Sequence, residues 1–240
     1  MLTGYEVMFD EHLRVKPKST RNVYRVKKDN VTYCYKDQAY YEYEALLHIN
    51  HESLPEIIDY NNGRLIKEWV EGEPLDCVHI TPTKELIRKF TKYTKELFDI
   101  VHSSNYILLD YTLKNIAYNE GQFRYFDFDA SVRFDVILTP LLGSGRHFSR
   151  PYESLLANVH YTDDYFAYAC VIYTCMIGSV PYLNDEKNSE LAKKNYQTTY
   201  KNIVPKFTTK LLETGLSKKE VDFIIACLNP FQTNRPTSFL

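Results

Sequence analysis

Two acidic positions lie on either side of a predicted β-hairpin near the middle of the chain. Asp110 is followed five residues later by Asn115, and Asp127 begins the triplet DFD. The segment between them, 116–126, has two short runs of apolar and aromatic residues separated by a turn at Gly121, which predicts two antiparallel strands. Because a hairpin brings its entry and its exit together, we expect Asp110, Asn115 and Asp127 to converge.

These converging side chains offer oxygen atoms, without histidine or cysteine beside them. Oxygen donors of this kind suit a hard cation, and Mg²⁺ is the usual one, held by one or two carboxylates together with water and phosphate oxygens. A carboxylate beside such a site that does not bind the metal can accept a proton from an attacking hydroxyl. The pattern therefore predicts a metal-assisted transfer site.

The same residues resemble two motifs of the protein-kinase superfamily, the catalytic loop H-R-D-x-x-x-x-N and the metal motif D-F-G. The chain has LLDYTLKN ending at Asn115 and DFD beginning at Asp127. The resemblance implies that Asp110 is the catalytic base and that Asn115 and Asp127 bind Mg²⁺ or Mn²⁺. Asp129 replaces a glycine and adds a carboxylate that either binds the metal or repels ATP, and Lys114 is a candidate contact for the γ-phosphate.

Further matches follow in the family's order towards the end of the chain. Pro151-Tyr152-Glu153 is similar to the A-P-E motif, residues 162–178 to the S-D-x-W-S-x-G helix, and Asn234-Arg235-Pro236 to the closing R-P motif. The resemblance implies a buried ion pair between Glu153 and Arg235. We also expect Asp164 to cap the start of its helix and, by resemblance, to anchor the catalytic loop.

The elements that must position this chemistry begin with a predicted meander of strands over 13–36 and a helix over 37–50. Lys36 ends the last strand and matches the V-A-I-K lysine, which implies contacts with the nucleotide phosphates and with a glutamate of the helix. Counting from the turn after the helix places that glutamate at Glu42, with Glu44 as its rival.

The phosphate loop of the family, G-x-G-x-x-G-x-V, is not preserved. Its three glycine positions hold Lys16, Lys18 and Arg21. Glycines let backbone N–H groups approach a phosphate closely, and these side chains prevent that. The three cations either attract phosphate through their side chains or form a solvated end of a hairpin.

Residues 64–75 resemble the strand and hinge that link the two lobes of a kinase. The resemblance implies that backbone groups of Glu68 and Val70 face adenine. Three more residues are expected to line the nucleotide site: Val23, Cys34 and Ala117. Lys67 takes a position that is normally apolar or small, so its ammonium group either extends to solvent or pairs with an acid.

After the hinge, residues 83–103 have apolar side chains at helical spacing and predict an amphipathic helix that ends just before the catalytic loop. The expected fold is therefore α+β with two lobes. Residues 1–70 form a small antiparallel β-sheet lobe with one helix and residues 71–240 a larger helical lobe, together one catalytic domain.

Composition restricts the partners. The net charge of −2 indicates neither nucleic acid nor a membrane surface. No apolar run is long enough for a membrane span, and the first residues have no signal-like core. Five cysteines without a CxxC pattern favour a reducing compartment. We therefore expect a cytoplasmic protein.

The favoured function is an ATP-dependent kinase acting on serine or threonine of a protein substrate. Two alternatives stay open at this point: a kinase-fold enzyme that phosphorylates a small molecule or sugar, and a pseudokinase that binds a partner without transfer. Leu109 replaces the arginine that grips a phosphorylated activation segment in the family, which predicts that this form of control is missing.

Overall fold

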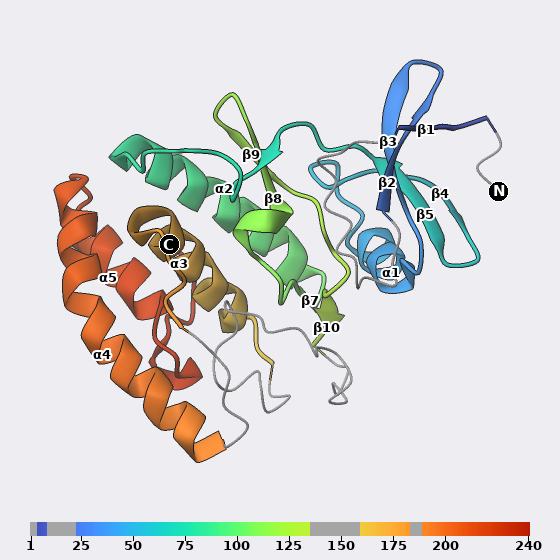
Figure 1. Ribbon diagram of the computed structural model, residues 1–240. Coiled ribbons are helices and arrows are strands. Elements are labelled where there is room, and N and C mark those ends of the chain that lie inside the picture. Colours follow the sequence, from blue (N-terminus) through green and yellow to red (C-terminus); the bar gives the residue numbers. More distant parts are fainter. Residues whose placement is uncertain (1–3, 9–22, 135–158, 183–188) are drawn as a thin grey trace.

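The computed structural model describes residues 4–8, 23–134, 159–182 and 189–240. Sheet strands occupy the first part of the described chain and long helices the second, with small sheets between them (Figure 1). This α+β arrangement of two lobes confirms the predicted fold class. The division of the lobes at residue 70 stays a prediction. Within the described residues, no helix combines the length and the hydropathy that a membrane crossing requires.

The first part is a five-stranded antiparallel sheet with strand order β1-β2-β3-β5-β4. Its strands are β1 (Glu6–Met8), β2 (Val23–Lys28), β3 (Val31–Lys36), β4 (Ile57–Asn61) and β5 (Arg64–Glu68). Two hairpins turn at Asp29-Asn30 and Asn62-Gly63, where both central residues have positive φ. Asparagine, aspartate and glycine tolerate this conformation, and such turns match the twist of the strands that they join.

Helix α1 (Tyr40–Ile49) packs beside this sheet. Its buried face combines Ala45, Leu46 and Ile49 with a single acid, Glu42. The helix ends at Asn50, which takes the left-handed conformation and donates its N–H to the Leu46 carbonyl, as helix termini commonly do. The helix is shorter than the predicted 37–50 but lies within it.

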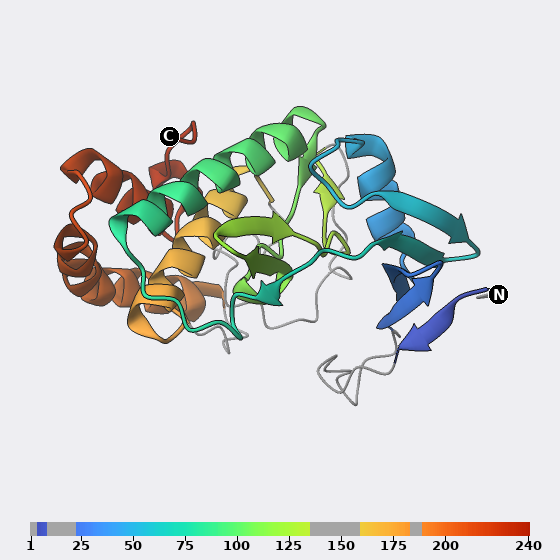
Figure 2. The ribbon, with the colours of Figure 1, turned by 90° about the horizontal axis from the view of Figure 1, so that it is seen from above.

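The second part consists of the helices α2 (Lys84–Ser103), α3 (Thr162–Ile177), α4 (Ser189–Glu213) and α5 (Lys218–Cys227). The helix predicted over 83–103 is confirmed as α2, and the Thr83 hydroxyl caps it by accepting the Leu86 N–H at 3.2 Å. Helix α3 is buried on nearly every side from Thr162 to Tyr173. It therefore runs through the interior of this part (Figure 2).

Two small sheets lie between the large sheet and the helices (Figure 2). One contains β6 (Glu73–Pro74), β8 (Ile116–Asn119) and β9 (Gln122–Tyr125), and the other pairs β7 (Tyr106–Ile107) with β10 (Val132–Arg133). The predicted hairpin is confirmed as β8 and β9, with positive φ at Glu120 and Gly121 in its turn. A short 3₁₀ turn over Leu113–Asn115 leads into β8.

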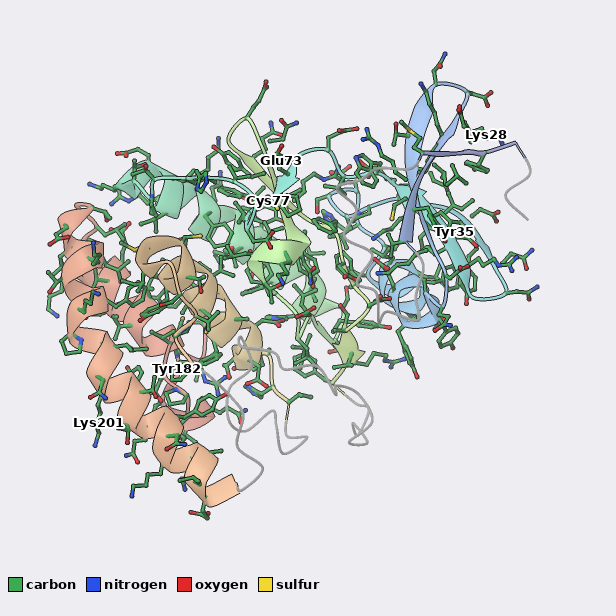
Figure 3. All side chains as sticks on the ribbon, in the orientation of Figure 1. Lys28, Tyr35, Glu73, Cys77, Tyr182 and Lys201 are labelled. Carbon is green, nitrogen blue, oxygen red and sulfur yellow. The ribbon has the colours of Figure 1, made fainter. Side chains whose placement is uncertain are left out.

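Aromatic side chains fill much of the core around α2 and α3. Four tyrosines are among the largest fully buried side chains: Tyr111, Tyr125, Tyr168 and Tyr182. Tyr182, labelled in Figure 3, stacks on Tyr196 with centroids 4.9 Å apart and donates its hydroxyl to the Leu228 carbonyl at 2.9 Å. These tyrosines therefore serve packing, with their hydroxyl groups satisfied where partners are present.

One expectation from sequence is not tested by the described residues, and two elements of the structure were not predicted. The expected strand around 13–15, together with Lys16, Lys18 and Arg21, lies outside the described residues. The edge strand found at Glu6–Met8 was not predicted. Helix α4, 25 residues long, was not predicted either, and it contains Pro205.

Candidate active site

The loop that carries Asp110 connects β7 to the short 3₁₀ turn before β8. Its backbone is held by Asp164, whose carboxylate accepts the N–H groups of Leu108 at 3.0 Å and Leu109 at 3.1 Å. Leu109 has a φ of 58°, a conformation that costs a non-glycine residue of order 1–3 kcal/mol. The charge-assisted bonds from Asp164 hold the loop in this conformation and so fix the residue that follows, Asp110.

Asp110 and Asn115 meet across this loop. The Asn115 amide nitrogen donates to the Asp110 carboxylate at 2.9 Å and to the Asp110 carbonyl at 3.0 Å. Tyr125, from the far strand of the hairpin, donates its hydroxyl to the same carbonyl at 3.2 Å. Because the Asn115 nitrogen is engaged on Asp110, the amide oxygen is the atom that Asn115 can offer to a cation.

The hairpin brings Asp127 towards the same place, as the sequence predicts. The Phe126 N–H donates to the Asn115 carbonyl at 3.1 Å, which continues the β8–β9 pairing to the residue just before Asp127. The convergence is therefore a consequence of the hairpin register and of the backbone bonds that extend it.

A cluster of lysines and carboxylates surrounds Asp127. The Lys36 ammonium contacts Glu42 at 2.8 Å, Asp127 at 2.9 Å and Asp129 at 2.7 Å. Lys67 contacts the other oxygen of Glu42. We refer to Lys36, Glu42, Lys67, Asp127 and Asp129 as the lysine–carboxylate cluster. It joins β3, α1, β5 and the chain after β9, so it links the large sheet to the rest of the molecule.

Glu42, and not its rival Glu44, meets Lys36. The Glu42 side chain is fully buried, while Glu44 lies two residues further along the helix and contacts the exposed His48 at 3.8 Å. Glu42 lies six positions after Lys36, and the contact forms because α1 begins almost immediately after β3.

The charges of the cluster set its protonation states. Burial acts to raise the pKa of Asp127, but the nearby charges of Lys36 and Lys67 outweigh it and hold the value at about 2. The pKa of Glu42 is lowered in the same way against its burial. Burial raises the pKa of Asp129 despite the contact with Lys36, and Asp127 adds to the rise.

The three acids of the cluster lie close enough together to hold a cation. Glu42, Asp127 and Asp129 offer oxygen atoms that lie within 4.8 Å of one another. Lys36 and Lys67 already take up the Glu42 carboxylate, whereas the side chains of Asp127 and Asp129 are 30% and 15% exposed. An ionised, partly exposed Asp127 and an all-oxygen donor set fit Mg²⁺ or Mn²⁺.

Lys67 does not extend to solvent. It is 3% exposed, and it donates to both Glu42 and the Phe126 carbonyl. The sequence left open whether this lysine reaches solvent or pairs with an acid, and the structure has the acid pair. The additional bond to Phe126 was not foreseen, because nothing in the sequence places a main-chain carbonyl opposite β5.

The residues expected to surround the nucleotide lie on several elements. Val23 pairs with Lys36 across β2 and β3, and Ala117 pairs with Pro74 across β6 and β8. Val70 and Ala117 are buried, and burial raises the pKa of the Cys34 thiol. Their roles towards a nucleotide stay predictions.

Glu68 and Lys114, also expected at the nucleotide site, lie in different surroundings, one in a side-chain ion pair and one exposed. Glu68 pairs with Arg124 of β9 through both of its oxygens, at 2.5 and 3.0 Å, so this hinge residue ties β5 to the central hairpin. Lys114 lies exposed in the 3₁₀ turn after Asp110. Its proposed contact with the γ-phosphate stays a prediction.

The expected cap on α3 is wrong. The helix begins at Thr162 after Tyr161, which makes no side-chain cap, and Asp164 lies inside the first turn. Its carboxylate is used for the Leu108 and Leu109 N–H groups and for His102, whose Nε2 lies 2.8 Å away. The contact with His102 was not predicted, because nothing in the sequence places the end of α2 opposite the start of α3.

Arg235 is buried and pairs with Asp163 at 2.7 Å. It also donates to the carbonyls of Thr162 at 2.8 Å and Pro230 at 3.3 Å. The expected partner, Glu153, lies outside the described residues. We refer to His102, Asp163, Asp164 and Arg235 as the α3 anchor, because all of them fix the start of this helix.

Comparisons with known proteins agree with this architecture. A family model described as the protein kinase domain matches residues 13–239. No curated protein sequence matches the chain. Because the family match spans nearly all of the sequence, the chain belongs to the protein kinase domain family.

Three solved structures share the fold at low identity. The PK-1 kinase of Cydia pomonella granulovirus is 18% identical with a TM-score of 0.72, over 99% of this chain and 92% of that one. Rad53 1–466 in complex with AMP-PNP is 17% identical with a TM-score of 0.71, over 98% of this chain and 63% of that one. A complex of the Rad53 kinase domain and SCD2 with AMPPNP is 16% identical, with a TM-score of 0.69 and coverages of 99% and 87%.

Proposed function

We propose that this chain transfers the γ-phosphoryl group of ATP to a serine or threonine hydroxyl of a protein substrate. The observation that carries the proposal is the joint placement of three contacts. Asn115 bonds to Asp110 at 2.9 Å, and Lys36 bonds to both Glu42 and Asp127. The family match and the AMP-PNP complexes of Rad53 support a nucleotide as the ligand.

Each residue of the site has a role that its chemistry supports. Lys36 donates to the phosphates of the nucleotide, and Glu42 orients the Lys36 ammonium from α1. Asp127 and the amide oxygen of Asn115 would hold the metal, with Asp129 as an additional carboxylate beside them. When bound, Mg²⁺ neutralises charge on the transferring phosphoryl group.

Asp110 orients the acceptor hydroxyl and accepts its proton. The Asn115 amide and the backbone held by Asp164 fix the position of the Asp110 carboxylate. Phosphoryl transfer asks a protein mainly for positioning and charge stabilisation, so a fixed carboxylate within hydrogen-bond reach of the hydroxyl is sufficient. No covalent intermediate with the protein is required.

A protein substrate is the favoured acceptor because the family match continues through the helical part to residue 239. In this reading, the large sheet and the hinge around Glu68 and Val70 hold the nucleotide, and the helices present the substrate. The lobe boundary that we propose is residue 70, and the protein acts in the cytoplasm.

The test is incubation of the purified chain with γ-labelled ATP, Mg²⁺ or Mn²⁺, and a generic protein substrate such as casein. Label should reach serine or threonine of the substrate, and Asp127→Asn should abolish the transfer. Asp99→Asn, a change in an exposed pair on α2, is the matched control and should keep full activity.

Two outcomes would contradict the proposal. Nucleotide binding can be followed through the fluorescence of Trp69, the single tryptophan of the chain. Binding without transfer to any acceptor would indicate a binding module. Full activity in Asp127→Asn would mean that the activity does not come from this site.

A further inference from the structure

Lys67 is an ammonium group inside the protein, on the fourth residue of β5 and next to the buried Leu65 and Ile66. A buried charge is costly unless it is paired and hydrogen-bonded. The position therefore demands partners, and the structure supplies two of different kinds.

The first partner of Lys67 is the Glu42 carboxylate. One Glu42 oxygen contacts Lys36 at 2.8 Å, and the other contacts Lys67 and also accepts the Phe128 N–H at 3.2 Å. Glu42 is thus held by two lysines from different strands and by the chain that carries Asp127. Loss of Lys36 from this arrangement would still leave Glu42 with a cation.

The second partner is the carbonyl of Phe126, the residue directly before Asp127. This bond crosses from β5 to the chain after β9 and holds the main chain from which the Asp127 side chain projects. Lys67 therefore contacts both α1, through Glu42, and the chain before Asp127, the two places where Lys36 also has its partners.

The lysine–carboxylate cluster contains more acidic than basic side chains. Glu42, Asp127 and Asp129 place three carboxylates close together, and Lys36 is a single cation in contact with all of them. Like charges at this range repel and disfavour binding of an anionic nucleotide. Lys67, in contact with Glu42, supplies a second cation and so reduces the excess of negative charge in the cluster.

We propose that Lys67 is a positioning residue of the phosphotransfer site, which holds Glu42 and the main chain before Asp127 and offsets the charge of Asp129. This inference rests on the proposed function for its catalytic consequence. The two departures from the family pattern, Lys67 and Asp129, are then one coupled feature. When Lys36 turns from the carboxylates to a phosphate, Lys67 keeps Glu42 and α1 in place.

The test is a double-mutant cycle with Lys67→Met and Asp129→Gly. Methionine matches the alkyl part of the lysine side chain and lacks the ammonium group, so the change removes the charge and its bonds and keeps most of the packing. Lys67→Met should lower kcat/KM for ATP by roughly 10–100-fold, the usual effect of losing a residue that orients metal ligands. Asp129→Gly in the Lys67→Met background should recover most of that loss, because it removes one of the three carboxylates that then share Lys36 as their cation.

A conservative variant separates positioning from mere packing. Lys67→Arg keeps the charge and the donors, and it should retain more kcat/KM than Lys67→Met even where the two melt at the same temperature. Equal activity of these two variants at matched melting temperature would overturn the positioning role.

The matched control is Arg124→Met. Arg124 is a partly buried cation of the same region that pairs with Glu68, outside the cluster. Its effect on melting temperature and on kcat/KM should add to that of Asp129→Gly without coupling. If Arg124→Met and Lys67→Met couple to Asp129→Gly by the same amount, the double-mutant cycle reports the overall charge of the region and not the contacts of Lys67.

The cycle is also measured without turnover, as melting temperatures and as ADP binding followed by Trp69 fluorescence. Asp129→Gly should raise the melting temperature more in the Lys67→Met background than in the unmodified chain. Additive effects would overturn the inference. An inactive unmodified chain with a coupled melting cycle would reject the proposed function and leave the charge compensation supported.

Discussion

The candidate site and the α3 anchor are both buried sets of charges, but their partners differ in kind. In the anchor, Asp164 accepts main-chain N–H groups, and Arg235 donates to main-chain carbonyls. In the lysine–carboxylate cluster, most bonds join one side chain to another across separate elements. Main-chain bonds persist as long as the fold does, whereas side-chain bonds can be exchanged for a ligand.

Exposure follows the same division. The side chains of Asp163 and Asp164 are 2% and 0% exposed, while that of Asp127 is 30% exposed. A ligand can therefore reach Asp127 more readily than Asp163 or Asp164. Substitutions in the site should therefore affect activity with little loss of stability, and substitutions in the anchor should do the reverse. The following predictions test this difference.

The largest effect is expected from Asp110→Ala in the site. The transfer rate should fall by roughly 10²–10⁴-fold, the usual contribution of a positioned base. ATP affinity should stay nearly unchanged because Lys36 and Asp127 remain, and the melting temperature should barely move because Asn115 keeps its bond to the Asp110 carbonyl. Single-turnover rates, nucleotide titration and thermal melting measure the three quantities. Loss of ATP binding would instead make Asp110 a ligand or a structural residue.

Arg235→Ala should have the opposite profile. Removing one partner of a buried pair leaves an uncompensated charge and costs about 3–5 kcal/mol of unfolding free energy. Each kcal/mol corresponds to roughly 2–4 °C in a chain of this size, so the melting temperature should fall markedly. Arg88→Ala, which breaks an exposed pair with Glu220, is the control. Equal melting temperatures for the two variants would mean that the buried Arg235 pair stabilises the fold no more than the exposed Arg88 pair does.

Asp164→Asn should connect the two regions. Hydrogen bonds to a charged group contribute about 1.5–3 kcal/mol, and the amide replaces one accepting oxygen by a donor. We expect a loss of this size in denaturant unfolding, together with a lower transfer rate, because Leu109 relaxes from its positive φ and shifts Asp110. A loss of stability at an unchanged rate would show that the anchor does not position the loop.

The parts of the fold that sequence predicted are those with strong local signals. The hairpin of β8 and β9 follows from Gly121 and its flanking apolar runs, and α2 follows from its apolar spacing and its Thr83 cap. Helix α4 has no comparable signal, since it contains Pro205 and several threonines. A proline inside a helix costs about 3 kcal/mol, so packing of buried residues such as Phe207 and Leu211 must stabilise this helix.

The candidate site shows the same limit. Lys36, Glu42 and Asp127 were predicted from motif order, and the structure brings them together. The partner of Lys67 and the use of His102 depend on which elements face each other across the core, which a single sequence does not contain. Asp164 was expected to cap its own helix and, by resemblance, to anchor the catalytic loop. The structure has its bonds to the loop and no cap from this residue, because the carboxylate that accepts the loop N–H groups lies inside the first turn.

The smallest effect is expected at the surface, from Glu220→Gln. Glu220 belongs to the capping box of α5 with Ser217, and it pairs with Arg88 of α2 at 2.6 and 3.1 Å. The bond from Arg88 is the main cause that lowers the pKa of Glu220 from 4.5 to about 2. Burial acts in the opposite direction, and hydrogen bonds from Ser217 add to the lowering of this pKa. The pair thus ties two helices without being buried, unlike the α3 anchor.

The sign of the pH dependence follows from this lowered pKa. A carboxylate with a folded pKa below its unfolded value stabilises the fold above about pH 4.5, and that contribution is lost as the pH falls towards about 2. Glutamine keeps the capping geometry but not the charge. The melting temperature of the unmodified chain should therefore exceed that of Glu220→Gln at neutral pH, and the difference should shrink over this range. Glu96→Gln, in an exposed pair at 3.9 Å, is the control, and its melting temperature should differ less from that of the unmodified chain. If the difference in melting temperature for Glu220→Gln stays constant from neutral pH down to about pH 2, the Arg88 contact contributes through packing and not through charge.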